Sequence, residues 1–142
     1  MAGLRIGYAI SNPELIKALN DVKYSYNSYT MNRPSLVLGV ESIHDDAYFR
    51  EKVGQIIATR ERFVKEIAEL GFTCLPSSAN FVFATHESIP AKEIFTAAKE
   101  NNIYVRYFDK PRIDNYLRIS IGTDAEMDAF VSFLTKYIKE YR

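Results

Sequence analysis

Apolar and polar residues alternate with a period of two over residues 116–121, which predicts a strand that leads directly into a helix. The apolar residues of this stretch fall on one face, and Arg118 and Ser120 fall on the other. Thr123 and Glu126 follow with the spacing of a capping box, the signature of a helix start. Arg118 is therefore predicted in mid-strand on the polar face. There its guanidinium either faces solvent or meets a planar anion through two parallel hydrogen bonds.

The second half of the chain shows the pattern of a compact α/β unit. Strands are predicted over residues 72–75, 80–84, 103–106 and 116–121, with helices over residues 90–101 and from residue 124 onward. This order predicts the α/β (α+β) fold class, with a small antiparallel or mixed sheet and helices on one side of it. If the strands that carry Arg106 and Arg118 pair, the two guanidiniums can converge on one anion. Because like charges repel, such a pair would favour an anion between them.

The N-terminal stretch is predicted to form a strand, a helix and an irregular loop. The strand covers Leu4–Ile10, and the helix begins at Pro13 with Asn12 as its cap. Residues 24–33 follow as a polar loop that contains three tyrosines. Such a segment is either a binding loop or a packed connection, and the sequence leaves both interpretations open.

Two helices are predicted to connect this stretch to the α/β unit. The first begins at Pro34, and residues 44–46 interrupt it. The second runs to Leu70, where Gly71 provides a natural stop. A helix of this length is typical of a connection between two structural units rather than of one compact core.

Composition and charge exclude several classes of partner. Of the 142 residues, 47% are hydrophobic and 13% are aromatic, which is enough for a packed core. Basic and acidic residues both number 18, so the formal net charge is +0. Neither a nucleic acid nor a membrane is therefore expected as a partner. One cysteine, Cys74, and two histidines are too few for a disulfide or for most metal sites. Without a membrane span or a signal peptide, a soluble cytoplasmic protein is expected.

Four stretches of the chain carry a family pattern. In chain order they are Ala2–Tyr8 (AGLRIGY), Glu69–Phe72 (ELGF), Pro76–Phe81 (PSSANF) and Tyr116–Thr123 (YLRISIGT). In this order they resemble the C-terminal part of the fold-type I aminotransferases that use pyridoxal 5′-phosphate. Within that family the sequence is most similar to the histidinol-phosphate aminotransferase branch.

The resemblance implies a role for each of several residues. Arg5 matches the arginine that holds the phosphate of the cofactor. Arg118 matches the arginine that receives the substrate carboxylate or, in the histidinol-phosphate branch, the phosphate of the amino donor. Arg106 matches the second phosphate-contacting arginine of that branch. Asn80 matches a position near the entrance of the active site.

One essential residue of the family is not found in this sequence. The Schiff-base lysine of the family lies about eight residues before the position of Arg5, which falls before Met1. The chain is therefore expected to be a C-terminal fragment that has no catalytic residue of its own and is inactive alone. In this interpretation residues 1–33 are a remnant of the large domain, residues 34–70 are the connecting helices and residues 71–142 are the small domain.

For the parent protein, the resemblance implies amino transfer between histidinol phosphate, or a related amino donor, and 2-oxoglutarate in histidine biosynthesis. The implied cofactor is pyridoxal 5′-phosphate. The implied partners are a small-molecule amino donor, a 2-oxo acid and a second subunit, since Tyr26 and Asn27 match a loop that approaches the neighbouring active site in family homodimers.

Two alternatives stay open. The first is another enzyme of the same fold, either a threonine-phosphate decarboxylase or an aromatic aminotransferase. The second is a stand-alone anion-binding α/β module without enzymatic activity. A stand-alone module predicts no exposed apolar patch over residues 4–40, whereas a part of a larger protein predicts one.

Overall fold

The computed structural model describes residues 2–141, which fold into two compact units that divide between Glu51 and Lys52. The elements follow the chain in the order η1 (Ala2–Leu4), α1 (Pro13–Tyr26), α2 (Arg33–His44), α3 (Asp46–Ala68), β1 (Phe72–Cys74), β2 (Phe81–His86), α4 (Ala91–Glu100), β3 (Arg106–Tyr107), β4 (Leu117–Ser120) and α5 (Asp124–Tyr141). The division falls within α3. The assignment of residues 1–33 to a remnant of a large domain, 34–70 to connecting helices and 71–142 to a small domain stays a prediction.

Asparagine caps begin both helices of the first unit. The Asn12 side chain accepts a hydrogen bond from the Leu15 backbone N–H at 2.9 Å, and the Asn32 side chain accepts one from that of Ser35 at 2.8 Å. Each cap is followed by a proline in the first turn, where the missing N–H costs nothing. The predicted helix start at Asn12 is therefore confirmed. The loop predicted over residues 24–33 is shorter than expected, because α1 continues through Tyr26.

The strand predicted over Leu4–Ile10 is wrong. The chain forms a single 3₁₀ turn at Ala2–Leu4 and then continues without regular structure to the start of α1. Period-two alternation does not make a strand without a hydrogen-bonded neighbour, and residues 2–51 contain no strand that could pair with it. The segment instead lies on α2, where the buried Ser35 hydroxyl donates to the Leu4 carbonyl at 3.2 Å.

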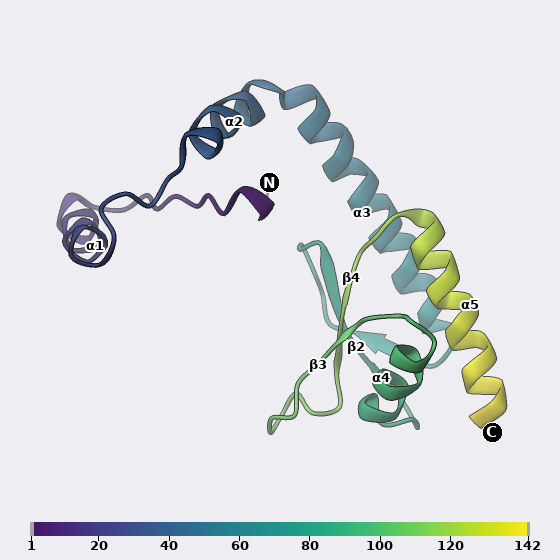
Figure 1. Ribbon diagram of the computed structural model, residues 1–142. Helices are drawn as coiled ribbons and strands as arrows, with labels where there is room; N and C mark the ends of the chain where they lie inside the picture. The colour runs from purple at the N-terminus through teal and green to yellow at the C-terminus, as the bar shows by residue number, and fades with distance from the viewer. Residues whose placement is uncertain (1, 142) are drawn as a thin grey trace. The chain divides into compact units, whose positions relative to one another are not determined.

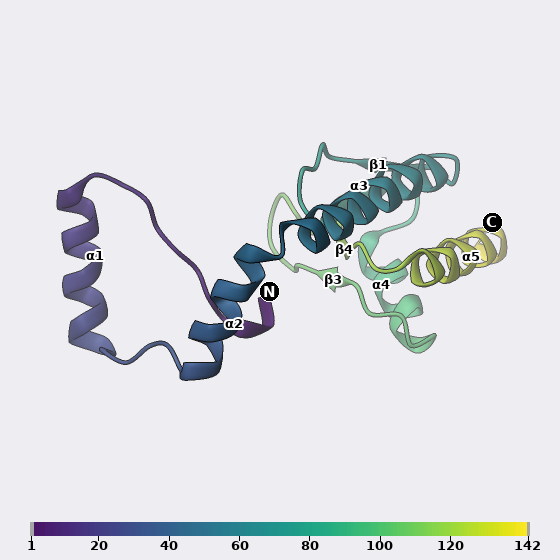
Figure 2. The same cartoon turned by 90° about the horizontal axis from the view of Figure 1, so that it is seen from above.

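The second unit is a small sheet with helices on one face. The strands are arranged in the order β1-β2-β4-β3, and every neighbouring pair is antiparallel. The core lies between the sheet and three helices, namely α4, α5 and the second half of α3. In it, Phe63 stacks on Phe130 with 6.0 Å between the ring centroids. Figure 1 shows α3 and α5 together on one side of the strands, and Figure 2 shows the same two helices side by side from above. The predicted fold class is confirmed.

The third strand is shorter than predicted and begins later. Residues 103–106 were expected to form it, but β3 covers only Arg106–Tyr107. Asn102 has a left-handed backbone with φ of 60°, and the Ile103 N–H still donates to the Ala98 carbonyl at 2.9 Å. Ile103 therefore completes the end of α4, and Ile103 and Val105 pack against the core rather than extending the sheet.

His86 joins two turns at one end of the β1–β2 pair. Its side chain is buried, and its Nε2 lies 2.9 Å from the Leu70 carbonyl. Its Nδ1 accepts from the backbone N–H groups of Ser88 at 3.2 Å and Ile89 at 3.0 Å. Because Nδ1 accepts two hydrogen bonds, the proton belongs on Nε2, which donates to Leu70. This imidazole fixes the turn before β1 to the turn after β2.

The start of α5 is held by a capping box and by an arginine from α3. The Thr123 N–H donates to Glu126 Oε2 at 2.7 Å, and the Thr123 hydroxyl donates to the same oxygen at 2.9 Å. The Arg62 guanidinium on α3 contacts the carboxylates of Asp124 at 3.0 Å and Asp128 at 2.6 Å. These contacts lower two pKa values: hydrogen bonds from Arg62 and Thr59 lower that of Asp124, and hydrogen bonds from Thr123 lower that of Glu126.

We expect the second unit to lose stability as the pH falls below about 4.5, because the carboxylates of Asp124 and Glu126 have lower pKa values when folded than their ordinary 3.8 and 4.5. Below these values the unfolded chain binds protons that the folded chain excludes, so protonation favours unfolding. Urea unfolding at pH 6, 4.5 and 3 measures the loss. Glu126→Gln should flatten the acid dependence, whereas Glu140→Gln at the other end of α5 is the matched control. An equal effect of both variants would contradict the prediction.

Candidate anion-binding site

The register of the sheet places two arginines directly opposite each other. Arg106 on β3 is the partner of Arg118 on β4, and both side chains are exposed. The neighbours of Arg118 in β4, Leu117 and Ile119, are buried on the helical face. Since side chains alternate between faces along a strand, the arginine pair lies on the face of the sheet that the helices of this unit leave open. The two arginine-bearing strands therefore pair, which is the condition that the sequence analysis set for the two guanidiniums to converge.

Aromatic rings surround the two guanidiniums. The ring centroid of Phe108 lies 5.4 Å from the Arg106 Cζ atom and 5.9 Å from the Arg118 Cζ atom. On β2, the other neighbour of β4, the ring centroid of Phe81 lies 5.4 Å from the Arg118 Cζ atom. Phe83, the partner of Arg118 in β2, contacts the edge of Phe108 at 6.3 Å. These are cation–π distances, so the rings hold the two cations against the sheet.

The two positive charges of this site favour a bound anion. Like charges directly opposite each other on neighbouring strands destabilise a sheet. Within residues 2–141, neither Arg106 nor Arg118 forms an ion pair with a carboxylate, although both are exposed. A phosphate or a carboxylate between the two guanidiniums would remove their repulsion and accept several charge-assisted hydrogen bonds. The arrangement is therefore suited to binding an anion.

Asn80 lies at the end of the loop that enters β2. Its backbone carbonyl accepts a hydrogen bond from the Ile121 N–H at 2.9 Å, which continues the pairing of β2 with β4 by one step. The loop before it is fixed because the Arg60 side chain donates to the Ala79 carbonyl at 2.7 Å and the Ser77 hydroxyl donates to the Phe81 carbonyl at 2.6 Å. Asn80 is thus held at one end of the β2–β4 pair, and no hydrogen bond joins its side chain to the arginines.

The other residues singled out from the sequence belong to the first unit. Arg5 is exposed and has a left-handed backbone with φ of 57°, which a residue with a side chain adopts only at some cost. Tyr26 is the last residue of α1, and the residue is 92% exposed. The Asn27 side chain accepts from the Tyr29 N–H at 3.0 Å and so shapes the turn after the helix. All three are accessible on the surface of this unit.

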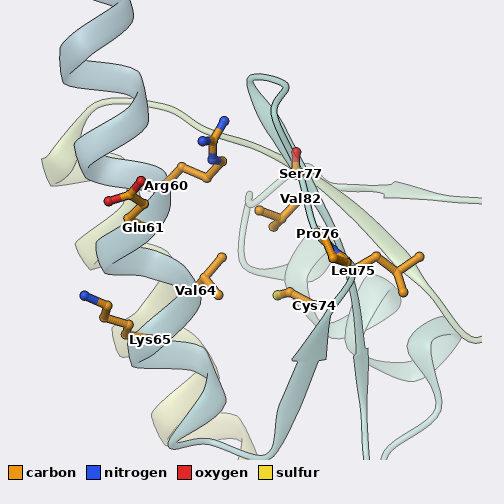
Figure 3. Close-up of a pocket in the computed structure, with 9 residues that line it drawn as sticks. All are labelled: Arg60, Glu61, Val64, Lys65, Cys74, Leu75, Pro76, Ser77 and Val82. Atoms are coloured by element: carbon orange, nitrogen blue, oxygen red, sulfur yellow. The ribbon is translucent and has the colours of Figure 1, made fainter.

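A cavity of about 370 Å³ lies between α3 and the strands β1 and β2, on a different part of the unit from the arginine pair. Figure 3 shows Val64 and Cys74 facing each other in it, whereas Glu61 and Lys65 point away from the strands. Burial raises the pKa of the Cys74 thiol to about 11, so the thiol is neutral and unreactive near pH 7.

The described part of the chain offers neither a metal site nor a membrane-spanning helix. Among residues 2–141, no group of three or more His, Cys, Asp or Glu side chains could hold a metal ion. No helix in the same range is long and apolar enough to cross a membrane.

Sequence reasoning missed the rings that contact the arginines. A signal was present, since Phe81 and Phe83 alternate with the buried Val82 and Ala84 and must therefore share a face. Which residues of β4 lie next to Phe81 and Phe83 depends on the register between β2 and β4. The sequence pattern of one strand does not determine that register. Phe108 gave no signal of its own, because it lies beyond the end of β3.

Comparisons with known proteins converge on one family. The family model described as aminotransferase class I and II matches residues 1–134. A histidinol-phosphate aminotransferase of Brachyspira hyodysenteriae is 46% identical over 139 residues, which are 98% of this chain and 39% of that relative. One of Marinomonas sp. is 48% identical over 136 residues, which are 94% of this chain and 38% of that relative.

A solved structure agrees with the sequence comparisons. The histidinol-phosphate aminotransferase of Sinorhizobium meliloti, determined in complex with pyridoxal-5′-phosphate, matches with a TM-score of 0.84 and 26% sequence identity. The match covers 100% of this chain and 39% of that chain. The chain thus spans 38–39% of the length of these relatives.

Proposed function

Because the chain belongs to the aminotransferase class I and II family, we propose that the complete protein is a transaminase that moves an amino group between histidinol phosphate and 2-oxoglutarate. The observation that carries this proposal is the Arg106–Arg118 pair on the open face of the sheet. Two facing guanidiniums fit a donor that bears a phosphate, and one guanidinium fork fits the carboxylate of 2-oxoglutarate or glutamate. One site can therefore receive the two substrates in turn.

The roles proposed for this chain are binding and orientation. Arg118 and Arg106 receive the phosphate of the donor, and Arg118 receives the carboxylate of the 2-oxo acid. Holding the anionic end of a substrate fixes where its amino or keto carbon lies, which lowers the entropic part of the barrier. Asn80 lines the entrance beside β2 and β4. The group that moves the proton belongs to a part of the complete protein outside this sequence.

Arg5 is the residue of this chain that suits pyridoxal 5′-phosphate. Its guanidinium is exposed, and within residues 2–51 it forms no ion pair, so it is free to neutralise the phosphate of the cofactor. When bound, the cofactor supplies an electron sink for the amino transfer. Tyr26 and Asn27 are proposed to reach a neighbouring subunit of a homodimer, and a cytoplasmic location completes the proposal.

The surface of the first unit supports a larger protein over a stand-alone module. Its helices and N-terminal segment expose many large apolar side chains, as a part of a larger core would. They include Ile10, Leu15, Leu19, Val22, Leu36, Val37, Leu38, Val40 and Ile43. So many exposed apolar side chains in one small unit favour a contact of this unit with other protein.

The test compares amino donors in the complete protein, loaded with pyridoxal 5′-phosphate. We expect histidinol phosphate to be used with a kcat/KM at least about a hundredfold higher than histidinol, because the unphosphorylated donor leaves the arginine pair without its anion. Release of carbon dioxide from threonine phosphate, or faster turnover of aromatic amino acids, would assign the protein to one of the alternatives instead. Measurable turnover by the 142-residue chain alone would contradict the proposal that this chain only binds and orients substrates.

A further inference from the structure

Phe108 contacts both members of the arginine pair. Its ring centroid lies 5.4 Å from the Arg106 Cζ atom and 5.9 Å from that of Arg118, whereas the ring of Phe81 contacts Arg118 alone. The negative face of an aromatic ring attracts cations, so a ring shared by two guanidiniums offsets part of their repulsion. Without such a ring, two long exposed side chains of like charge would move apart, because each has many rotamers available.

Neighbouring residues hold the Phe108 ring in place. Phe83 contacts it edge to face at 6.3 Å, and Tyr116 stacks on Phe83 at 4.7 Å with an interplanar angle of 8°. The Phe108 carbonyl also accepts from the Lys110 N–H at 3.0 Å, which closes a turn directly after the ring. The contact with Phe83, on which Tyr116 stacks, and the turn after the ring therefore fix Phe108 beside the guanidiniums.

We propose that Phe108 is a positioning residue that holds Arg106 and Arg118 together for one doubly charged anion and so favours a phosphomonoester over a carboxylate. This inference rests on the proposed function, in which the pair binds the phosphate of the donor. A phosphomonoester carries a charge of about −1.5 to −2 near pH 7 and offers three acceptor oxygens, so it gains from both guanidiniums at once. A carboxylate carries one charge and two oxygens, which a single guanidinium satisfies. Loss of the shared ring should therefore weaken phosphate binding more than carboxylate binding.

The experiment titrates the chain with methyl phosphate and with acetate while NMR follows the side-chain Nε–H signals of its arginines. Arg106→Lys and Arg118→Lys assign the two signals. In the unmodified chain we expect both signals to move along one binding curve with methyl phosphate. Phe108→Leu should weaken methyl phosphate binding about fivefold to tenfold and change acetate binding less than about twofold.

Matched variants distinguish the effect of the aromatic ring from the effect of side-chain volume and from that of a nearby aromatic residue. Phe108→Tyr keeps the ring and should restore the affinity for methyl phosphate. Phe108→Met keeps the volume without the ring, so it replaces the leucine variant if that variant does not fold, and it should show the same loss. Tyr104→Leu removes an exposed aromatic side chain two residues before Arg106 and should leave both affinities unchanged.

The outcomes distinguish this inference from the function on which it rests. If methyl phosphate moves both arginine signals but the leucine or methionine variant binds it as well as the unmodified chain, the role of Phe108 is wrong and the anion site stands. Equal losses for phosphate and acetate would overturn the selectivity. If methyl phosphate moves neither arginine signal in the unmodified chain, the proposed anion site fails, and the role of Phe108 fails with it.

Discussion

Arg118→Ala in the complete protein should raise the KM for histidinol phosphate about a hundredfold. A hydrogen bond to a charged group contributes about 1.5–3 kcal/mol, and a hundredfold loss corresponds to about 2.7 kcal/mol. The KM for 2-oxoglutarate should rise as well, because the same guanidinium is proposed to receive its carboxylate. Arg118→Lys should recover only part of both losses, since an ammonium keeps the charge but not the two parallel hydrogen bonds. Steady-state kinetics of the two half-reactions measure these changes.

Lys139→Ala is the matched control for this prediction. It also removes one positive charge, but from α5, which packs against the opposite face of the sheet from Arg118. The control should leave both KM values within about twofold, because the interaction between exposed charges is screened beyond about 10 Å at ordinary salt. Unchanged KM values for both substrates in Arg118→Ala would show that the arginine does not bind substrate. A matching rise in Lys139→Ala would show that the effect is one of net charge only.

His86→Ala should lower the free energy of unfolding of the second unit by about 3 kcal/mol. The imidazole is buried and makes three hydrogen bonds to the backbone, with Leu70, Ser88 and Ile89. Removing it leaves three backbone groups without this partner, among them the N–H of the buried Ile89, and an unpaired buried group costs about 1–3 kcal/mol. The variant also loses the edge contact of the ring with Phe72 at 4.9 Å. Urea unfolding followed by circular dichroism measures the loss.

Two variants test whether the hydrogen bonds are the cause. His86→Asn retains an acceptor near the position of Nδ1 and should lose less stability than His86→Ala. His44→Ala replaces an exposed histidine at the end of α2 and should change the free energy of unfolding by less than about 0.5 kcal/mol. If His86→Ala unfolded at the same urea concentration as the unmodified chain, the imidazole would not join the two turns. A loss in His86→Asn as large as in the alanine variant would point to packing instead.

In the second unit, one face of the sheet packs into the core and the other carries the proposed anion site. Val82, Leu117 and Ile119 pack under the helices and give the sheet its stability. Arg118 and Phe81, which alternate with them, lie on the other face and need not contribute to the core. Because the helical face fixes the register of the strands, it also fixes where the two guanidiniums meet. Substitutions in the core should therefore alter anion binding through the register.

The sequence by itself determined the features that depend on neighbouring residues. The caps at Asn12 and Thr123 were predicted correctly, because a cap is made by groups within one turn of the helix. The face of Arg118 was also predicted, because alternation along one strand is local. The fold class and the family followed from stretches that each have a recognisable local pattern.

The tertiary structure alone decided what depends on a distant partner. Leu4–Ile10 has the alternation of a strand but forms none, because a strand forms only beside another strand and residues 2–51 contain no other. The pairing of Arg106 with Arg118 and the contact of Phe108 with both of them depend on a register that three strands set together. Shifting that register by one residue would move every side chain of a strand to the opposite face, so the anion site exists only once the core has formed.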